Sequence, residues 1–178
     1  NAGLNVTVAT ITLDNVGSTP VVDINFDTDA DGAATLTSGA ILTLGSLTAD
    51  GQGTNDTMTF TSTVETQGTT IAINQANQVN FQGDVTAETS LTVSNINTEI
   101  DLAAGVDLTA QAGNVDLNNT VAQIDLSGAG TNVITATGAA AEVQLDDVVD
   151  SANITELEIN AGLNISVATI TLNDVGST

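Results

Sequence analysis

Apolar and polar residues alternate with a period of two along most of the chain. Segments such as NVTVATITL (5–13), TMTFTSTVE (57–65) and EVQLD (142–146) show this alternation, which places successive side chains on opposite faces of a β-strand. Gly, Asn and Asp, which favour tight turns, separate the segments. The pattern predicts an all-β protein built from many short strands joined by polar turns.

Pairs of apolar residues two positions apart align the predicted strands with one another. Eight steps from pair to pair lead from Val6 to Ile165. A step of about 20 residues suits one turn of a parallel β-helix, in which each turn stacks on the previous one and buries a continuous core. We therefore predict a parallel β-helix (β-solenoid) of about eight turns over residues 1–159. The aligned pairs are Val6/Val8, Ile24/Phe26, Leu42/Leu44, Met58/Phe60, Val79/Phe81, Ile100/Leu102, Ile124/Leu126, Val143/Leu145 and Ile165/Val167.

Segments 1–19 and 160–178, at the two ends of the chain, are near-copies of each other. With Asn1 aligned to Asn160, fifteen of the nineteen positions are identical, and the differences are conservative, such as Val6 against Ile165. A fixed period of this kind is the sequence signature of a repeat architecture. We expect residues 1–159 to form one unit of a tandem β-solenoid and residues 160–178 to begin the next unit.

The stretch VNFQGDVTAETSLTVSNINTEIDLAAGVDLTAQAGNVDLNN (79–119) resembles the β-strand repeats of very large bacterial surface proteins. These include filamentous-haemagglutinin-like adhesins and related β-solenoid surface fibres. The resemblance covers most of the chain and lies in composition and rhythm. It implies a right-handed parallel β-helix, secretion, and an adhesive or fibrous role. Members of such families often carry some Lys and Arg, whereas this chain has neither.

A second architecture also fits a repeat of this length. Two immunoglobulin-like β-sandwiches in tandem would each have about 80 residues, near the usual size of such a domain. The Cys, Trp and Tyr residues that mark these domains are absent, and the short step between apolar pairs favours the β-helix. The alternative function that accompanies this fold is a calcium-stiffened modular cell-surface adhesin.

The charge of the chain restricts its partners. It has 22 acidic residues and no Lys, Arg or His, which gives a formal net charge of −22. Binding to nucleic acid or to an anionic membrane surface needs basic side chains, and no apolar stretch reaches the length of a membrane span. We expect no nucleic acid partner, no membrane insertion, and an extracellular or cell-surface location, where a chain without trypsin cleavage sites is well suited.

The residue inventory also argues against an enzyme. Acid–base and nucleophilic catalysis usually use His, Lys or Cys, and all three are absent. Paired carboxylates can hydrolyse glycosides, but the Trp and Tyr platforms typical of sugar clefts are missing as well. We expect a structural segment of an extracellular fibre or adhesin stalk, which associates with itself end to end and by lateral bundling and requires no cofactor.

One motif suggests a metal site. The segment DTDADG places Asp27, Asp29 and Asp31 at alternate positions before Gly32, as in the first half of a calcium-binding loop. The twelfth position holds Ser38 instead of a bidentate Glu, so an acidic, solvated turn is the competing interpretation. Because no internal base neutralises the carboxylates, we expect divalent cations, Ca²⁺ in particular, to stiffen the fibre and to let neighbouring fibres lie side by side.

Five N-x-S/T sequons are candidate glycosylation sites in an extracellular protein. The sequon of Asn5 recurs in the second copy of the repeat because Thr7 is replaced there by Ser166. A hydroxyl group needed for strand packing would explain the same substitution. The five candidates are Asn5, Asn55, Asn118, Asn153 and Asn164.

The predicted register also separates inward from outward positions. Leu102 and Ile124 are assigned to the core, where no base could pair with an introduced carboxylate. Asp107 and Asp125 are assigned to the outer surface, so exchanging either of them for Asn is expected to be nearly silent.

Overall fold

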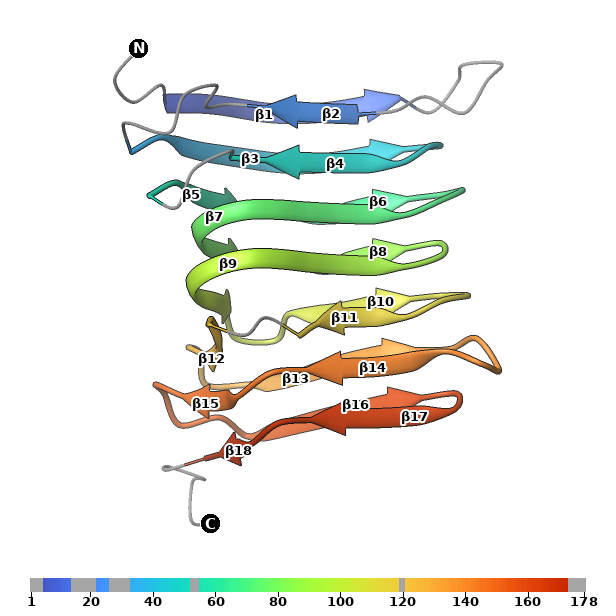
Figure 1. Cartoon of the computed structure of the whole chain (residues 1–178). Helices are drawn as coiled ribbons and strands as arrows, with labels where there is room; N and C mark the ends of the chain where they lie inside the picture. Colours follow the sequence, from blue (N-terminus) through green and yellow to red (C-terminus); the bar gives the residue numbers. More distant parts are fainter. Residues whose placement is uncertain (1–4, 14–21, 26–32, 52–54, 119–120, 173–178) are drawn as a thin grey trace.

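The computed structural model describes residues 5–13, 22–25, 33–51, 55–118 and 121–172 (Figure 1). These residues form eighteen β-strands in a single sheet. No helix among the described residues is long and apolar enough to cross a membrane. The strands are β1 (Asn5–Leu13), β2 (Val22–Asn25), β3 (Thr35–Thr43), β4 (Leu47–Asp50), β5 (Thr57–Phe60), β6 (Val64–Thr66), β7 (Ile71–Phe81), β8 (Val85–Ala87), β9 (Leu91–Leu102), β10 (Asp107–Ala110), β11 (Val115–Leu117), β12 (Gln123–Leu126), β13 (Thr131–Ala136), β14 (Glu142–Leu145), β15 (Val148–Asp150), β16 (Glu156–Ala161), β17 (Asn164–Val167) and β18 (Ile170–Thr171).

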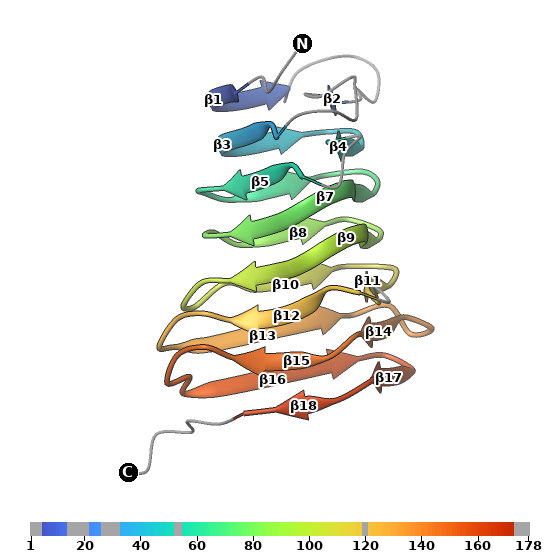
Figure 2. The same cartoon turned by 60° about the vertical axis from the view of Figure 1, so that its left-hand side comes forward.

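Parallel pairing arranges the strands on three ladders, which we call faces A, B and C. Face A contains the first halves of β1 and β3, then β5, the second halves of β7 and β9, and β12, β15 and β18. Face B contains the second halves of β1 and β3, then β6, β8, β10, β13 and β16. Face C contains β2, β4, the first halves of β7 and β9, and β11, β14 and β17. The turns form a column with β1 at one end and β18 at the other (Figures 1 and 2).

This column confirms the predicted parallel β-solenoid and excludes the alternative of tandem immunoglobulin-like sandwiches, whose sheets are antiparallel. The predicted number of turns is wrong. Over the described residues the chain makes about six turns between β1 and β15, not the eight predicted for residues 1–159. The successive members of face A along these turns are Val6, Leu36, Met58, Val79, Ile100, Ile124 and Val148.

The predicted register is correct in the middle of the chain. The pairs Met58/Phe60, Val79/Phe81, Ile100/Leu102 and Ile124/Leu126 stack on one another in that order. Each of these side chains is fully buried. Each predicted step between these four pairs is therefore one real turn of the solenoid.

The register is wrong toward both ends. Ile24 stacks on Ala49, and Val143 stacks on Val115, so both belong to face C instead of face A. At the C-terminal end of β3 the side chains of Ile41 and Thr43 are buried, whereas Leu42 between them is partly exposed. All three faces carry the same alternation, so a pair from one face can be matched with a pair from another. That mismatch made the predicted turns too short.

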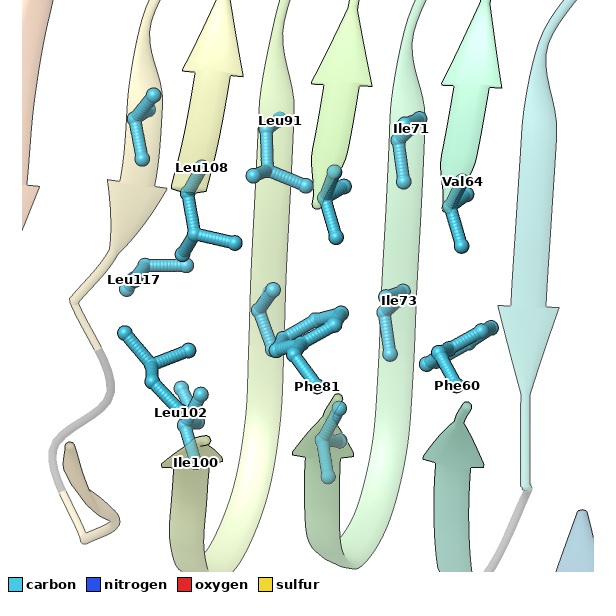
Figure 3. Packing of buried hydrophobic residues seen from close by; sticks show 14 of the residues in the cluster. Phe60, Val64, Ile71, Ile73, Phe81, Leu91, Ile100, Leu102, Leu108 and Leu117 are labelled. Atoms are coloured by element: carbon cyan, nitrogen blue, oxygen red, sulfur yellow. The ribbon is translucent and has the colours of Figure 1, made fainter. Parts of the chain in front are cut away.

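Inward side chains of the three faces form one apolar core along the column (Figure 3). Phe60 and Phe81, on successive turns of face A, stack with ring centroids 5.6 Å apart and an interplanar angle of 15°. Each fully buried large apolar side chain contributes about 1.5–3 kcal/mol to the free energy of unfolding. The largest fully buried side chains are Phe60, Phe81, Leu36, Ile41, Leu47, Met58, Ile71, Ile73, Leu91, Ile96, Ile100 and Leu102.

Two long strands turn the corner from face C to face A without a loop. Gln75 in β7 and Asn95 in β9 have positive φ angles of 52° and 56°, and they occupy equivalent places because their neighbours Asn74 and Ser94 pair in register. One left-handed residue reverses the alternation, so that the next residue points inward, as the buried Ala76 does. Asn adopts this conformation more readily than Gln does.

The two near-copies of the 19-residue segment lie on different faces. In the first copy, Val6 lies on face A and Ile11 on face B. In the second copy, their counterparts Ile165 and Ile170 lie on face C and face A. The path along the chain from Val6 to Ile165 is therefore not a whole number of turns; it is six turns and two further faces.

The core predicts the cost of a buried carboxylate. Leu102→Asp should lower the free energy of unfolding by several kcal/mol at neutral pH, because Leu102 is 0% exposed and the chain has no base to pair with the new charge. Leu102→Asn introduces an uncharged side chain of similar shape to Asp, so it should lower the free energy of unfolding by less. Urea denaturation at neutral and at acid pH measures both; equal losses at neutral pH would show that position 102 is open to solvent.

The positive φ angle of Gln75 predicts that a residue which tolerates this conformation will increase the free energy of unfolding. Gln75→Asn should raise the free energy of unfolding by up to about 1 kcal/mol, and Gln75→Val should lower it by about 1–2 kcal/mol. Ala72→Val, in the extended part of the same strand, is the control and should have little effect. Chemical denaturation of the three variants measures the differences, and a stabilising Gln75→Val would show that the corner is not left-handed.

Candidate functional site: an acidic cluster on face A

Three carboxylates meet on the outer side of face A. Glu99 and Asp101 are two positions apart in β9, so both point away from the core. Asp125 in β12 is the register partner of Asp101 one turn further along, and Gln123 is the partner of Glu99. The stacking of β12 on β9 therefore places Asp125 directly against Asp101 and diagonally from Glu99.

The three side chains are close and unequally buried. One carboxylate oxygen from each lies within 4.8 Å of one from each of the other two. Asp125 is only 8% exposed, whereas Glu99 and Asp101 are partly exposed. Two full negative charges at this separation repel by about 3–4 kcal/mol at an effective dielectric constant near 20. Solvent at the exposed side of the cluster screens part of this repulsion.

Only some of the carboxylate oxygens in the cluster accept hydrogen bonds. Gln78 in β7 donates from Nε2 to Oε1 of Glu99 at 2.9 Å. Ser127, which follows β12, donates to the Asp101 carboxylate. Oδ1 of Asp101 and Oδ1 of Asp125 are both buried and accept no hydrogen bond. Buried polar atoms are normally paired, so these two oxygens are exceptions that need an explanation.

A further unpaired oxygen lies one turn away on the same ladder. Asn80 in β7 is the register partner of Asp101, and its Nδ2 donates to Oγ1 of Thr59 at 3.1 Å. Its Oδ1 is buried and accepts no hydrogen bond. Asn80, Asp101 and Asp125 thus present a buried, unpaired oxygen on three successive turns.

Burial and mutual repulsion change the protonation of the cluster. The pKa of Glu99 is raised, first by burial and then by the charges of Asp125 and Asp101, against the opposing hydrogen bond from Gln78. The pKa of Asp101 is also raised by burial and by Asp125, while the hydrogen bond from Ser127 lowers it. Both groups are therefore easier to protonate than ordinary carboxyls.

Two other carboxylates among the described residues accept hydrogen bonds from neighbouring groups. Asp56 is 0% exposed, but its Oδ1 accepts a hydrogen bond of 2.8 Å from the backbone N–H of Ala34 and so joins two turns. Glu142 on face C accepts hydrogen bonds from Asn164 at 2.8 Å and Gln144 at 2.9 Å, and these lower its pKa. The cluster on face A differs because carboxylates there face one another.

Among the described residues, none of the site residues predicted from sequence belongs to this cluster. The proposed calcium ligands Asp27, Asp29 and Asp31 lie outside the described residues. The five sequon asparagines are all exposed, and Asn164 uses its amide to bind Glu142. That exposure suits glycosylation, which stays a prediction. The five are Asn5, Asn55, Asn118, Asn153 and Asn164.

The prediction that Asp125 is an ordinary surface residue is wrong. Its side chain points outward, as predicted, but the neighbouring turns and side chains leave it only 8% exposed. The cluster itself was missed by sequence reasoning. The signal was available, because the correct alignment of Ile100/Leu102 with Ile124/Leu126 also aligns Asp101 with Asp125. Asp107, by contrast, is partly exposed, and its Oδ1 accepts a hydrogen bond of 3.2 Å from the N–H of Val133.

Comparisons with known proteins do not identify a family. No protein-family model, no curated protein and no solved structure matches the chain. The β-solenoid implied by the resemblance to bacterial surface fibres is present. The family itself is not identified by any match.

The arrangement has two ways to relieve its repulsion. The carboxyls can share protons, as paired carboxyls do elsewhere, or they can bind a hard cation, for which carboxylate oxygens are the preferred ligands. The chain itself offers no third way because it contains no Lys, Arg or His.

The raised pKa values predict how stability depends on pH when a chelator removes divalent cations. The folded chain binds protons at Glu99 and Asp101 more tightly than the unfolded chain does. Their contribution to stability is fully present below the ordinary carboxyl pKa and is lost as the pH rises through the raised values. The melting temperature should therefore increase from about pH 7 down to about pH 4.

Charge-matched variants separate this effect from the general charge of the chain. Glu99→Gln should reduce the increase of melting temperature on acidification, whereas Glu158→Gln, at an exposed position of β16, should leave it unchanged. Equal slopes for both variants and for the parent chain would contradict a coupling between Glu99 and its neighbours.

Proposed function

We propose that this chain is a structural unit of an extracellular fibre or adhesin stalk. The observation that carries the proposal is the continuous parallel ladder on all three faces, which further turns of the same kind can extend. Among the described residues, β16, β17 and β18 pair only with the preceding turn. A free edge of this kind is a template for another strand.

The last turn also exposes apolar side chains that the inner turns bury. Leu163 is 59% exposed, Ile165 51% and Ile170 47%, whereas Val143 and Val148, which stack on the two isoleucines, are 0% exposed. A further turn stacked on this end would bury them and would satisfy the free backbone groups at the same time. The duplicated 19-residue segment supports an occupant of the same sequence, in tandem or in a second copy.

The proposed mechanism is mechanical. Every turn is hydrogen-bonded to its neighbours, so a load along the column is shared by parallel ladders on three faces. The acidic surface keeps separate columns apart, and divalent cations or protons from solution allow them to bundle. Exposed sequons and the absence of trypsin cleavage sites support an extracellular location. The alternative of a modular adhesin loses its support because the described residues form a β-solenoid and not sandwich domains.

Assembly through the open end is testable with point variants. The double variant Ile165→Lys and Ile170→Lys should abolish elongated assemblies in electron micrographs, because two lysines would replace the apolar contacts of the next turn. Val121→Lys is the control, since Val121 is 65% exposed but precedes β12, which has a paired turn on both sides. Assemblies of the parent chain should give a fibre-diffraction reflection at about 4.8 Å along the axis.

Two outcomes would overturn the proposal. One is a parent chain that stays monomeric at high concentration, also in millimolar Ca²⁺ and at acid pH. The other is the formation of assemblies that the end variant does not affect, or that the control variant disrupts equally.

A further inference from the structure

We propose that Glu99, Asp101 and Asp125 form a binding site for a divalent cation of the Ca²⁺ type, which joins two successive turns of the solenoid. The site is distinct from the DTDADG segment, and it does not depend on the proposed fibre, because all three ligands belong to one chain. Three observations carry it: the geometry of the oxygens, the unpaired buried Asp125, and the absence of any basic side chain.

The geometry allows one ion to contact all three carboxylates. Their ligand oxygens lie within 4.8 Å of one another, and two ligands on opposite sides of a Ca²⁺ ion are about 4.6–5.2 Å apart, twice the usual Ca–O distance. The ligands come from β9 and β12, which the register holds in place. Partial exposure of Glu99 and Asp101 leaves an entry path and room for water to complete the coordination.

The burial of Asp125 points to a ligand more strongly than the cluster alone does. Asp125 is more than nine-tenths buried, and its Oδ1 is buried without any hydrogen-bond donor. One of its carboxylate oxygens lies within 4.8 Å of one from Asp101 and one from Glu99. Oδ1 of Asp101 is also buried without a hydrogen-bond donor. A cation between the two would pair both oxygens and turn the repulsion between stacked carboxylates into attraction through the ion.

The composition of the donors selects the type of ion. The three donors are carboxylate oxygens, and the chain has no His or Cys to attract softer metals. Asn80, one turn before Asp101, presents an unpaired amide oxygen on the same ladder and is a candidate for a fourth protein ligand. Ca²⁺ accepts such irregular sets of oxygens, whereas Mg²⁺ demands a near-octahedral set at shorter distances. We therefore expect Ca²⁺ to bind more tightly than Mg²⁺.

The central test is a reversal in the effect of one substitution. Asp125→Asn removes a buried charge, so in chelator the variant should melt at a higher temperature than the parent chain. In millimolar Ca²⁺ the order should reverse, because the parent chain gains stability from the bound ion and the variant loses a ligand. A residue with only a packing role would shift the melting temperature in the same direction under both conditions.

Calorimetric titration of the chelator-treated whole chain with Ca²⁺ alone measures the binding directly. Asp125→Asn and Asp101→Asn should each raise the Kd of one saturable site by at least about tenfold. Glu158→Gln removes one exposed charge on face B, and it should leave that site unchanged. The triple variant Asp27→Asn, Asp29→Asn and Asp31→Asn should also retain it, which separates the two candidate sites.

Several results would overturn the proposal. If the parent chain shows no saturable site, or if Glu158→Gln weakens Ca²⁺ binding as much as Asp125→Asn does, then the cations form only a diffuse atmosphere around the acidic surface. If Asp125→Asn is stabilising to the same extent with and without Ca²⁺, the cluster is neutralised by protons. Either result leaves the fibre proposal intact, because that proposal is tested by the end variants.

Discussion

Parallel stacking in register is the constraint on which the rest of this structure depends. It places each residue of one turn against its equivalent in the next, so similar side chains repeat along a ladder. For apolar residues the result is favourable, as in the stacked Phe60 and Phe81 and the fully buried column from Met58 to Ile124. For charged residues the same geometry is costly, because Asp101 and Asp125 are direct register partners on adjacent strands. The apolar core and the acidic cluster both result from the stacking of equivalent residues in register.

Much of the fold could be predicted from the sequence because each turn of a solenoid repeats a similar pattern of apolar and polar residues. Alternation along strands such as β5 and β12 identified both the strands and their buried sides. The number of turns could not be predicted, because three faces share one pattern and only hydrogen-bond register distinguishes them. The sequence pattern assigns Ile24 and Val143 to face A, whereas their strand pairing places them on face C. The positive φ angle at Gln75 could not be predicted either, because Gln has no preference for the left-handed conformation.

The candidate site was harder to predict than the fold, for a physical reason. A linear motif such as DTDADG concentrates its carboxylates in one loop, where sequence inspection finds them. The cluster of Glu99, Asp101 and Asp125 draws its members from two turns, and a full turn of chain separates Asp125 from its register partner. The correct alignment of the neighbouring isoleucines contained the information. Apolar residues define the alignment, whereas the burial of the outward residues depends on packing between turns that no sequence period records.

The offset between the two copies of the 19-residue segment has a geometric consequence. Val6 of the first copy lies on face A and its counterpart Ile165 lies on face C, so near-identical sequence is displayed in different directions around the axis. In a tandem array each unit would be rotated by one face relative to its neighbour, and the original orientation would return after three units. A feature carried once per unit, such as a sugar chain or a bound ion, would then follow a spiral around the column. Such an array would carry these groups on all three faces. Two columns could then not associate through one face that is free of them along its whole length.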